Sequence, residues 1–223
     1  MRFSRLAVGT VSAGLLGLTP SAIASPGHAA GTWTTTTVAA PDVTELVIGD
    51  ELVVTVDVDA SNGLVPDGTS TLLALEAGAS AWAPVATNTS SGGDFFDVRP
   101  TTNTTYKVAY AGWTDPDTVN GDSYTASESA PFTVGVARRI TLPESGFVLR
   151  GKVTPDYARK KITIRASRRI DRGYRAFTTT RTDRRGKYEV TLPKRRGRWY
   201  WLVSTRSDST YLANSYVWET LIS

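Results

Sequence analysis

The sequence predicts an all-β protein that consists of two tandem antiparallel β-sandwiches after a signal peptide. Three observations support this prediction: apolar and polar residues alternate along short segments, turn-forming clusters separate these segments, and a pattern in the first half of the chain recurs in the second. The chain has 223 residues, of which 40% are hydrophobic and 21% are charged. This composition is typical of folded domains and excludes a long disordered polymer.

The beginning of the chain has the composition of a secretory signal peptide. Arg2 and Arg5 precede an apolar run over residues 6–18, and residues 22–24 read Ala-Ile-Ala, the small-x-small pattern of a cleavage site. Residues 1–24 are therefore predicted to direct export and to be removed, with cleavage as late as residue 30 left open. The later cut would also remove His28. No later segment has the roughly 20 apolar residues of a membrane helix, which predicts a secreted protein.

Alternation with a period of two residues predicts the strands. In residues 52–59 the valines at positions 54, 56 and 58 share one face, while Thr55, Asp57 and Asp59 share the other. Clusters of Ser, Asn, Asp, Pro and Gly at residues 61–63, 66–68 and 90–93 supply turns between such segments. Short strands at this spacing are typical of a sandwich.

A repeat divides the remainder of the chain. Residues 90–110 align without a gap with residues 183–203. The alignment superposes Phe95 on Tyr188, Pro100 on Pro193, Tyr106 on Trp199 and Val108 on Trp201. Residues 32–136 and 137–223 are therefore predicted to be two related sandwiches.

The repeated residues resemble those of a known group. The pattern in residues 98–108, Val-x-Pro followed by Thr-Thr-Tyr-x-Val, resembles the corner between the fifth and sixth strands of immunoglobulin-like and fibronectin type III domains. The pattern in residues 182–188 is similar to a hairpin of bacterial immunoglobulin-like and carboxypeptidase regulatory-like modules of exported proteins. The resemblance implies immunoglobulin-like sandwiches in which the Tyr106 hydroxyl bonds to upstream backbone. Trp199 replaces this tyrosine in the second half, and its indole N–H donates only.

The two predicted domains carry opposite charge. Residues 25–136 contain two basic and fourteen acidic residues, for a formal charge of −12, whereas residues 137–223 contain twenty-one basic and seven acidic residues, for a charge of +14. The whole chain has a net charge of only +4. The sign changes at residues 137–139, which is also the predicted domain boundary.

The composition excludes much enzyme chemistry. There is no Cys and a single His, so cysteine nucleophiles, disulfides, thiolate metal sites and a Ser-His-Asp triad are not expected. The loop with Asp115, Asp117 and Asp122 offers oxygen ligands for calcium, but its spacing departs from the EF-hand pattern. The catalytic groups still available to a hydrolase are two carboxylates or a Ser-Lys pair, and no pattern in the sequence brings such residues together. The sequence predicts no enzyme, no cofactor and no metal.

Register arguments predict a binding surface in the second domain. In residues 160–166 the isoleucines at 162 and 164 should face the core, which turns Lys161 and Arg165 outward beside the strand that carries Tyr200. The same argument places Trp199 and Trp201 in the core. The turn at residues 194–198 completes this surface, and the hairpin tip at residues 181–187 forms a second basic cluster. The predicted polyanion-binding residues are Lys161, Arg165, Arg184, Arg185, Lys187, Lys194, Arg195, Arg196, Arg198 and Tyr200.

These observations predict a secreted, non-catalytic adhesion or scaffold protein that is non-covalently associated with the cell wall. Its basic domain is expected to attract polyanions, with anionic cell-wall polymer or polysaccharide and extracellular nucleic acid as partners. Two alternatives remain open. The oppositely charged domains would dock on each other or on a partner, or the chain would be a cell-wall hydrolase.

Overall fold

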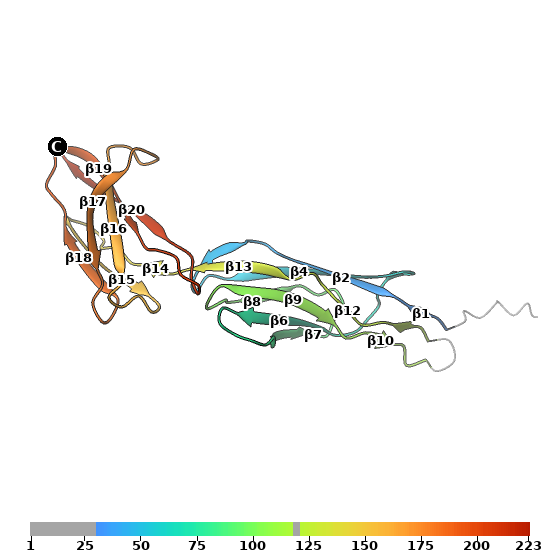
Figure 1. The fold of residues 1–223 in the computed structure, drawn as a ribbon. Coiled ribbons are helices and arrows are strands. Elements are labelled where there is room, and N and C mark those ends of the chain that lie inside the picture. The colour runs from blue at the N-terminus through green and yellow to red at the C-terminus, as the bar shows by residue number, and fades with distance from the viewer. Residues whose placement is uncertain (1–29, 118–120) are drawn as a thin grey trace, which may run out of the picture.

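The structure, a computed structural model, describes residues 30–117 and 121–223, and its elements are strands (Figure 1). The predicted signal peptide, residues 1–24, and His28 lie outside the described residues. Within the described ranges, no helix has the length and apolarity to cross a membrane.

The first half of the chain forms a sandwich with a small additional sheet. One layer contains β2 (Thr35–Pro41), β4 (Leu52–Ala60), β5 (Gly63–Leu64) and β8 (Phe95–Val98). The other contains, in spatial order, β3 (Glu45–Val47), β13 (Phe132–Ala137), β9 (Thr104–Tyr110), β6 (Ser70–Glu76) and β7 (Ala83–Asn88), with β12 (Ser127–Glu128) beside β9. The small sheet joins β1 (Thr32–Trp33), β11 (Ser123–Tyr124) and β10 (Trp113–Thr114). Only the β13–β3 and β1–β11 pairs among these are parallel.

The second half forms a sandwich of two antiparallel sheets. One contains β14 (Arg139–Ile140), β15 (Val148–Thr154) and β18 (Lys187–Thr191). The other contains, in spatial order, β17 (Arg175–Arg181), β16 (Lys161–Ser167), β19 (Gly197–Ser204) and β20 (Ser215–Ile222). The predicted fold class, two tandem β-sandwiches, is confirmed.

Each half has its own buried core, as alternating apolar residues require. In β4 the valines at 54, 56 and 58 are buried and the polar residues between them are exposed. In the second half Ile162, Ile164 and Trp201 are fully buried. One cluster of buried residues extends from Leu46 to Val136 and includes Tyr211, and the other extends from Ile140 to Val203.

The repeat corresponds to equivalent strands. The aligned residues Phe95 and Tyr188 are both 4% exposed, in β8 and β18. The expected bond from the Tyr106 hydroxyl to upstream backbone is absent among the described residues, because this buried side chain interacts with Thr104 instead. In the second sandwich the Trp199 indole does reach upstream backbone, since Nε1 donates to the Arg196 carbonyl at 3.4 Å.

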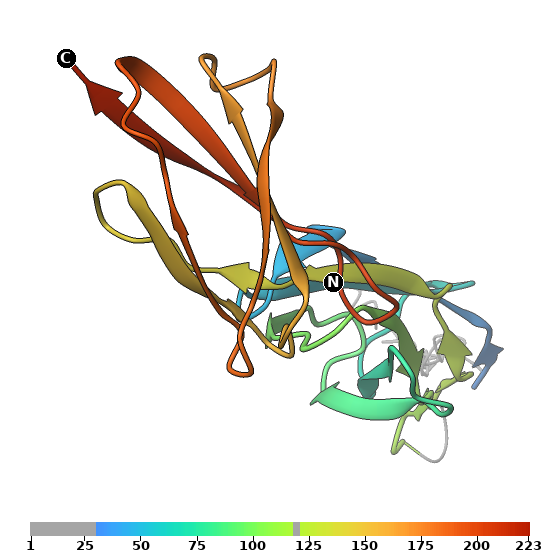
Figure 2. The same cartoon turned by 60° about the vertical axis from the view of Figure 1, so that its left-hand side comes forward.

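The sandwiches meet end to end through a short connection and a loop. Arg138 alone separates β13 from β14. Residues 205–214, the red loop between β19 and β20 in Figure 2, reach back to lie beside β13. The Leu212 N–H donates to the Val136 carbonyl at 2.8 Å, and Tyr211 joins the first core. The two domains therefore contact each other through this joint.

Few charges meet across the joint. Arg139 Nη2 binds Asp50 Oδ1 at 3.0 Å and also donates to the Ile48 carbonyl at 2.9 Å. Among the described residues this is the one ion pair between the two sandwiches. Nearly all charged residues of the acidic and basic halves therefore lie outside the contact between the sandwiches.

Candidate functional site

The structure separates the predicted basic residues into two groups at opposite ends of the second sandwich. Strand β16 has seven residues and spans about 20 Å. At its start, the hairpin between β17 and β18 lies against it, with the Thr182 N–H donating to the Lys160 carbonyl at 3.0 Å. At its far end, Gly197 lies close to the Arg168 guanidinium. The proximal group is Arg184, Arg185 and Lys187, and the distal group is Lys194, Arg195, Arg196 and Arg198.

The outer face of β16 follows the predicted register. Lys161 and Arg165 are exposed, and the isoleucines between them are buried. Arg165 lies opposite Leu202 of β19, so the predicted strand neighbour is correct. Tyr200 is only 9% exposed, however, and it interacts with Arg198. The expectation of an accessible aromatic ring at this position is therefore wrong, because neighbouring side chains of the same face cover the ring.

The distal end contains a cluster of arginines around a tryptophan. The Cζ atoms of Arg168 and Arg195 lie 4.8 and 4.5 Å from the ring centroid of Trp199. Trp199 is half-buried at the end of the core, whereas Trp201 is fully buried as predicted. A guanidinium that stacks on an indole keeps its N–H edge available for an anion. Trp199 thus positions two cationic groups.

The loop before β17 adds further arginines and is held in shape by local bonds. Ser167 Oγ donates to the Arg172 carbonyl at 2.6 Å and accepts from the Arg169 N–H at 3.0 Å. The Tyr174 hydroxyl donates to the Ile170 carbonyl at 2.8 Å. A cavity of about 480 Å³ opens between this loop and Trp199. We call the residues Arg168, Arg169, Arg172, Arg175, Arg195 and Trp199 the distal Arg–Trp cluster.

Most arginines of this cluster form no ion pair with a carboxylate of the described residues. Asp171 lies 3.8 Å from Arg172, and both side chains are exposed. In the described parts of the chain, the other four arginines of the cluster have no carboxylate oxygen within 4.0 Å. An anion from outside would therefore find preorganised donors with little competition.

The sequence reasoning missed five of the six members of the cluster, because it assigned Trp199 to the core and did not single out four of the arginines. Arg168, Arg169, Arg172 and Arg175 occupy one hairpin between β16 and β17, and their density within eight residues was a visible signal. The alternation along β16 does not predict where these side chains point, because the strand ends at Ser167 and they follow it.

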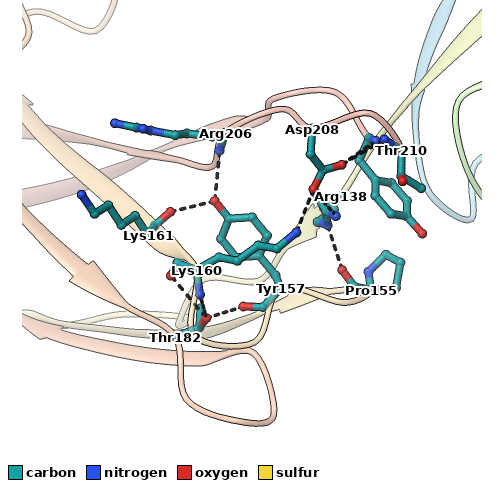
Figure 3. A network of polar contacts seen from close by, with 10 residues as sticks. Arg138, Pro155, Tyr157, Lys160, Lys161, Thr182, Arg206, Asp208 and Thr210 are labelled. Carbon is teal, nitrogen blue, oxygen red and sulfur yellow. Dashed lines mark hydrogen bonds and ion pairs between the residues drawn. The ribbon is translucent and has the colours of Figure 1, made fainter.

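A buried polar network holds the proximal end of the second sandwich (Figure 3). The Arg138 side chain is 2% exposed, and its Nη2 donates to Asp208 Oδ2 at 2.8 Å while Nε donates to the Pro155 carbonyl at 2.9 Å. Its Cζ lies 4.0 Å from the Tyr211 ring centroid and 5.2 Å from that of Tyr157. The network ties the interdomain connection to loop 205–214.

Asp208 is the anionic centre of this network. Lys160 Nζ binds the same carboxylate oxygen as Arg138, at 2.8 Å, and Oδ1 accepts the backbone N–H groups of Thr210 and Tyr211. Desolvation by burial opposes ionisation, but the hydrogen bonds from Lys160 and Arg138 outweigh it and hold the pKa of Asp208 well below its usual range. The carboxylate is thus charged at neutral pH.

We expect this network to make folding stability sensitive to acid. The pKa of Asp208 is lower in the folded than in the unfolded chain, so its stabilisation is complete above about pH 4 and is lost as the pH falls further. Urea unfolding between pH 2 and pH 7 should show a smaller acid-dependent loss in Asp208→Asn than in the wild type. Asp171→Asn is the comparison at an exposed loop carboxylate. Identical pH profiles for wild type and Asp208→Asn would contradict the assignment.

In the acidic loop of the first sandwich, two described aspartates accept hydrogen bonds from backbone N–H groups. Asp122 Oδ1 accepts the Gly31 N–H at 2.9 Å, and Asp115 Oδ1 accepts the Asp117 N–H at 2.9 Å. No group of three or more potential metal ligands among His, Cys, Asp and Glu occurs in residues 30–117 and 121–223.

Comparison with known proteins places the chain in no family. Neither the known protein families nor the curated proteins include a match. The ligand-binding domain of human OSCAR is 14% identical, with 82% of this chain and 96% of that chain covered, at a TM-score of 0.30. The chicken CNTN1 FN1-FN3 domains are 10% identical, with 85% and 66% covered, at a TM-score of 0.30. Three N-terminal domains of the bacteriophage RB49 outer capsid protein Hoc are 16% identical, with 84% and 58% covered, also at 0.30. The chain spans less than two thirds of the last two chains, and similarity at this level assigns no function.

Proposed function

We propose that the chain is an exported, non-catalytic adhesion or scaffold module whose second sandwich binds anionic envelope polymer or polysaccharide. One observation carries this proposal: in the distal Arg–Trp cluster four arginines line a cavity beside Trp199, Arg168 and Arg195 lie over the Trp199 ring, and four of the five arginines have no carboxylate partner within the described residues. Arginine matches phosphate, sulfate and carboxylate groups through paired N–H donors.

The arrangement of the two halves supports this function over mutual neutralisation. The halves touch at the joint through Arg139 and Asp50, and this contact leaves the distal end of the second sandwich far from the acidic first sandwich (Figure 1). Because charges more than about 8 to 10 Å apart are screened at physiological salt, the acidic half does little to neutralise the distal arginines. A polymer outside the molecule is therefore the expected counter-charge.

Charge reversal at the distal cluster tests the proposal. The double variant Arg168→Glu, Arg195→Glu should elute from heparin and from purified wall polymer at clearly lower salt than the wild type. The loss of two contacts should lower the slope of log K against log salt by about two. The matched control is Arg159→Glu, Arg206→Glu, which changes the charge of the same domain equally at exposed positions outside the cluster.

The two double variants distinguish binding at the distal Arg–Trp cluster from attraction by the net positive charge of the whole domain. A large shift for the distal variant and a small one for the control supports the proposal. Equal shifts would show that net charge alone governs retention, and unchanged elution of both variants would refute polymer binding by this domain. Circular dichroism of each variant verifies that the sandwich remains folded.

A further inference from the structure

We infer that a second anion-binding site lies in the cleft between strands β15, β17 and β18, at the proximal end of the second sandwich, and that it takes closely spaced tetrahedral oxyanions of a linear chain. This site is separate from the distal Arg–Trp cluster, so it goes beyond the function proposed above. The shared chemistry of its ligands is the phosphate or sulfate group.

The cleft has the size and the lining of an anion site. It encloses about 670 Å³. Four cationic side chains line it together with the hydroxyl-bearing residues of the strands and only two carboxylates. The lining cations are Arg150, Lys152, Arg181 and Lys187, and the carboxylates are Asp183 and Glu189.

Like charges face each other across the strands at this end. Lys152 of β15 lies directly opposite Lys187 of β18, and Lys161 of β16 lies directly opposite Arg181 of β17. All four side chains are exposed, and no carboxylate oxygen of the described residues lies within 4.0 Å of their charged nitrogens. Directly opposed like charges destabilise a sheet. A bound anion would relieve this repulsion, which explains how such pairs are tolerated.

Neither carboxylate of the cleft forms an ion pair with Lys152 or Lys187. Asp183 Oδ1 accepts the backbone N–H groups of Arg185 and Lys187 at 2.7 and 2.8 Å, so its role is to shape the hairpin turn. Glu189 lies opposite Arg150 in the ladder. Asp183 also interacts electrostatically with Lys187 and Arg185, which helps to lower the pKa of its carboxyl. Lys187 is therefore partly compensated, whereas Lys152 has no carboxylate oxygen of the described residues within 4.0 Å.

The floor of the cleft is closely packed and carries no charge. Gly151 lies opposite Tyr188, and a Cβ atom at this position would collide with the Thr141 carbonyl and approach the Tyr188 hydroxyl. That hydroxyl donates to the Thr141 carbonyl at 2.8 Å, and burial raises the pKa of Tyr188 to about 12. The phenol stays protonated at neutral pH, so it presents no negative charge to an incoming anion.

A second hollow extends the cleft. It encloses about 350 Å³ and shares Lys152 with the first, and Arg184 and Arg185 line its other side. Lys152 thus borders both hollows. Successive oxyanions of one chain fit this arrangement better than a single isolated ion, because each hollow has its own cations and Lys152 contacts both.

Thermal unfolding and calorimetry of the full chain test the inference, with tripolyphosphate as the probe and inorganic sulfate at equal ionic strength as the second arm. Tripolyphosphate should raise the Tm of the wild type. Lys187→Gln should weaken tripolyphosphate binding at least fivefold, and its Tm without anion should equal or exceed that of the wild type because the opposed charge is gone. Arg206→Gln, which removes an exposed cation outside both groups, should bind as the wild type does.

The outcomes are distinguishable from those of the polymer assay. Equal weakening by both variants, or a lowered anion-free Tm of Lys187→Gln with full binding retained, would overturn the site. No Tm response of the wild type to tripolyphosphate or sulfate would overturn it as well, while retention of the distal variants on polymer still tests the proposed function by itself. A larger response to tripolyphosphate than to sulfate supports a site for linked oxyanions, whereas an equal or larger response to sulfate would overturn the assignment of a linear chain.

Discussion

Arg138→Ala is expected to destabilise the protein by about 3 kcal/mol, because it deletes a fully buried side chain together with its hydrogen bonds to the partly exposed Asp208 carboxylate and the Pro155 carbonyl. The same change deletes the cation between the Tyr157 and Tyr211 rings. Urea unfolding measures the loss of stability. Small-angle scattering should also show a wider range of angles between the two sandwiches.

The neighbouring arginine supplies the control. Arg139 also binds a carboxylate, but its side chain is 49% exposed and that of Asp50 is 53% exposed. Exposed ion pairs contribute about 0 to 1 kcal/mol, so Arg139→Ala should have a small effect on unfolding. Similar losses in the two variants would contradict the assignment of the joint to the buried Arg138 network.

Trp201→Ala should produce the second large effect, a loss of about 3 to 5 kcal/mol confined to the second sandwich. The side chain is fully buried, its Nε1 donates to Thr220 Oγ1 at 2.9 Å, and its ring contacts that of Phe177. The loss is comparable with the total stability of a small domain. Differential scanning calorimetry should therefore show an early transition for the second sandwich, with the transition of the first nearly unchanged.

A partly buried tryptophan of the other sandwich is the matched control. Trp82 lies near Lys107 and outside the buried cluster of the first sandwich, so Trp82→Ala should cost much less. If Trp201→Ala instead lowered both transitions together, the two halves would unfold as one unit. Tyr211, which belongs to the second half of the chain but to the first core, would then be the expected physical link.

The strands were the most predictable part of the fold. Alternation places Val54, Val56 and Val58 on the buried face of β4, and the same rule turns Lys161 and Arg165 outward on β16. Such predictions succeed because the two faces of a strand follow from a period of two residues, which is a local property.

The candidate sites were only partly predictable. The sequence indicated two basic clusters, one around β16 and the turn at residues 194–198 and a second at the hairpin tip, but it did not show that β16 holds the proximal and distal groups about 20 Å apart. Tyr200 was expected to be accessible and is buried. The Lys152–Lys187 pair was not noticed, because cross-strand partners are known only after the register between distant strands is known.

From its sequence alone, this protein is an all-β chain with an acidic half and a basic half, because composition and alternation are properties of residues and their near neighbours. Only the tertiary structure decided which charges meet: Arg168 and Arg195 on Trp199, Lys152 opposite Lys187, and Tyr211 in the core of the other half. Apart from Arg195 on Trp199, these contacts join residues that are far apart in the chain. Their positions depend on strand order, register and loop length, and no local pattern in the sequence encodes these.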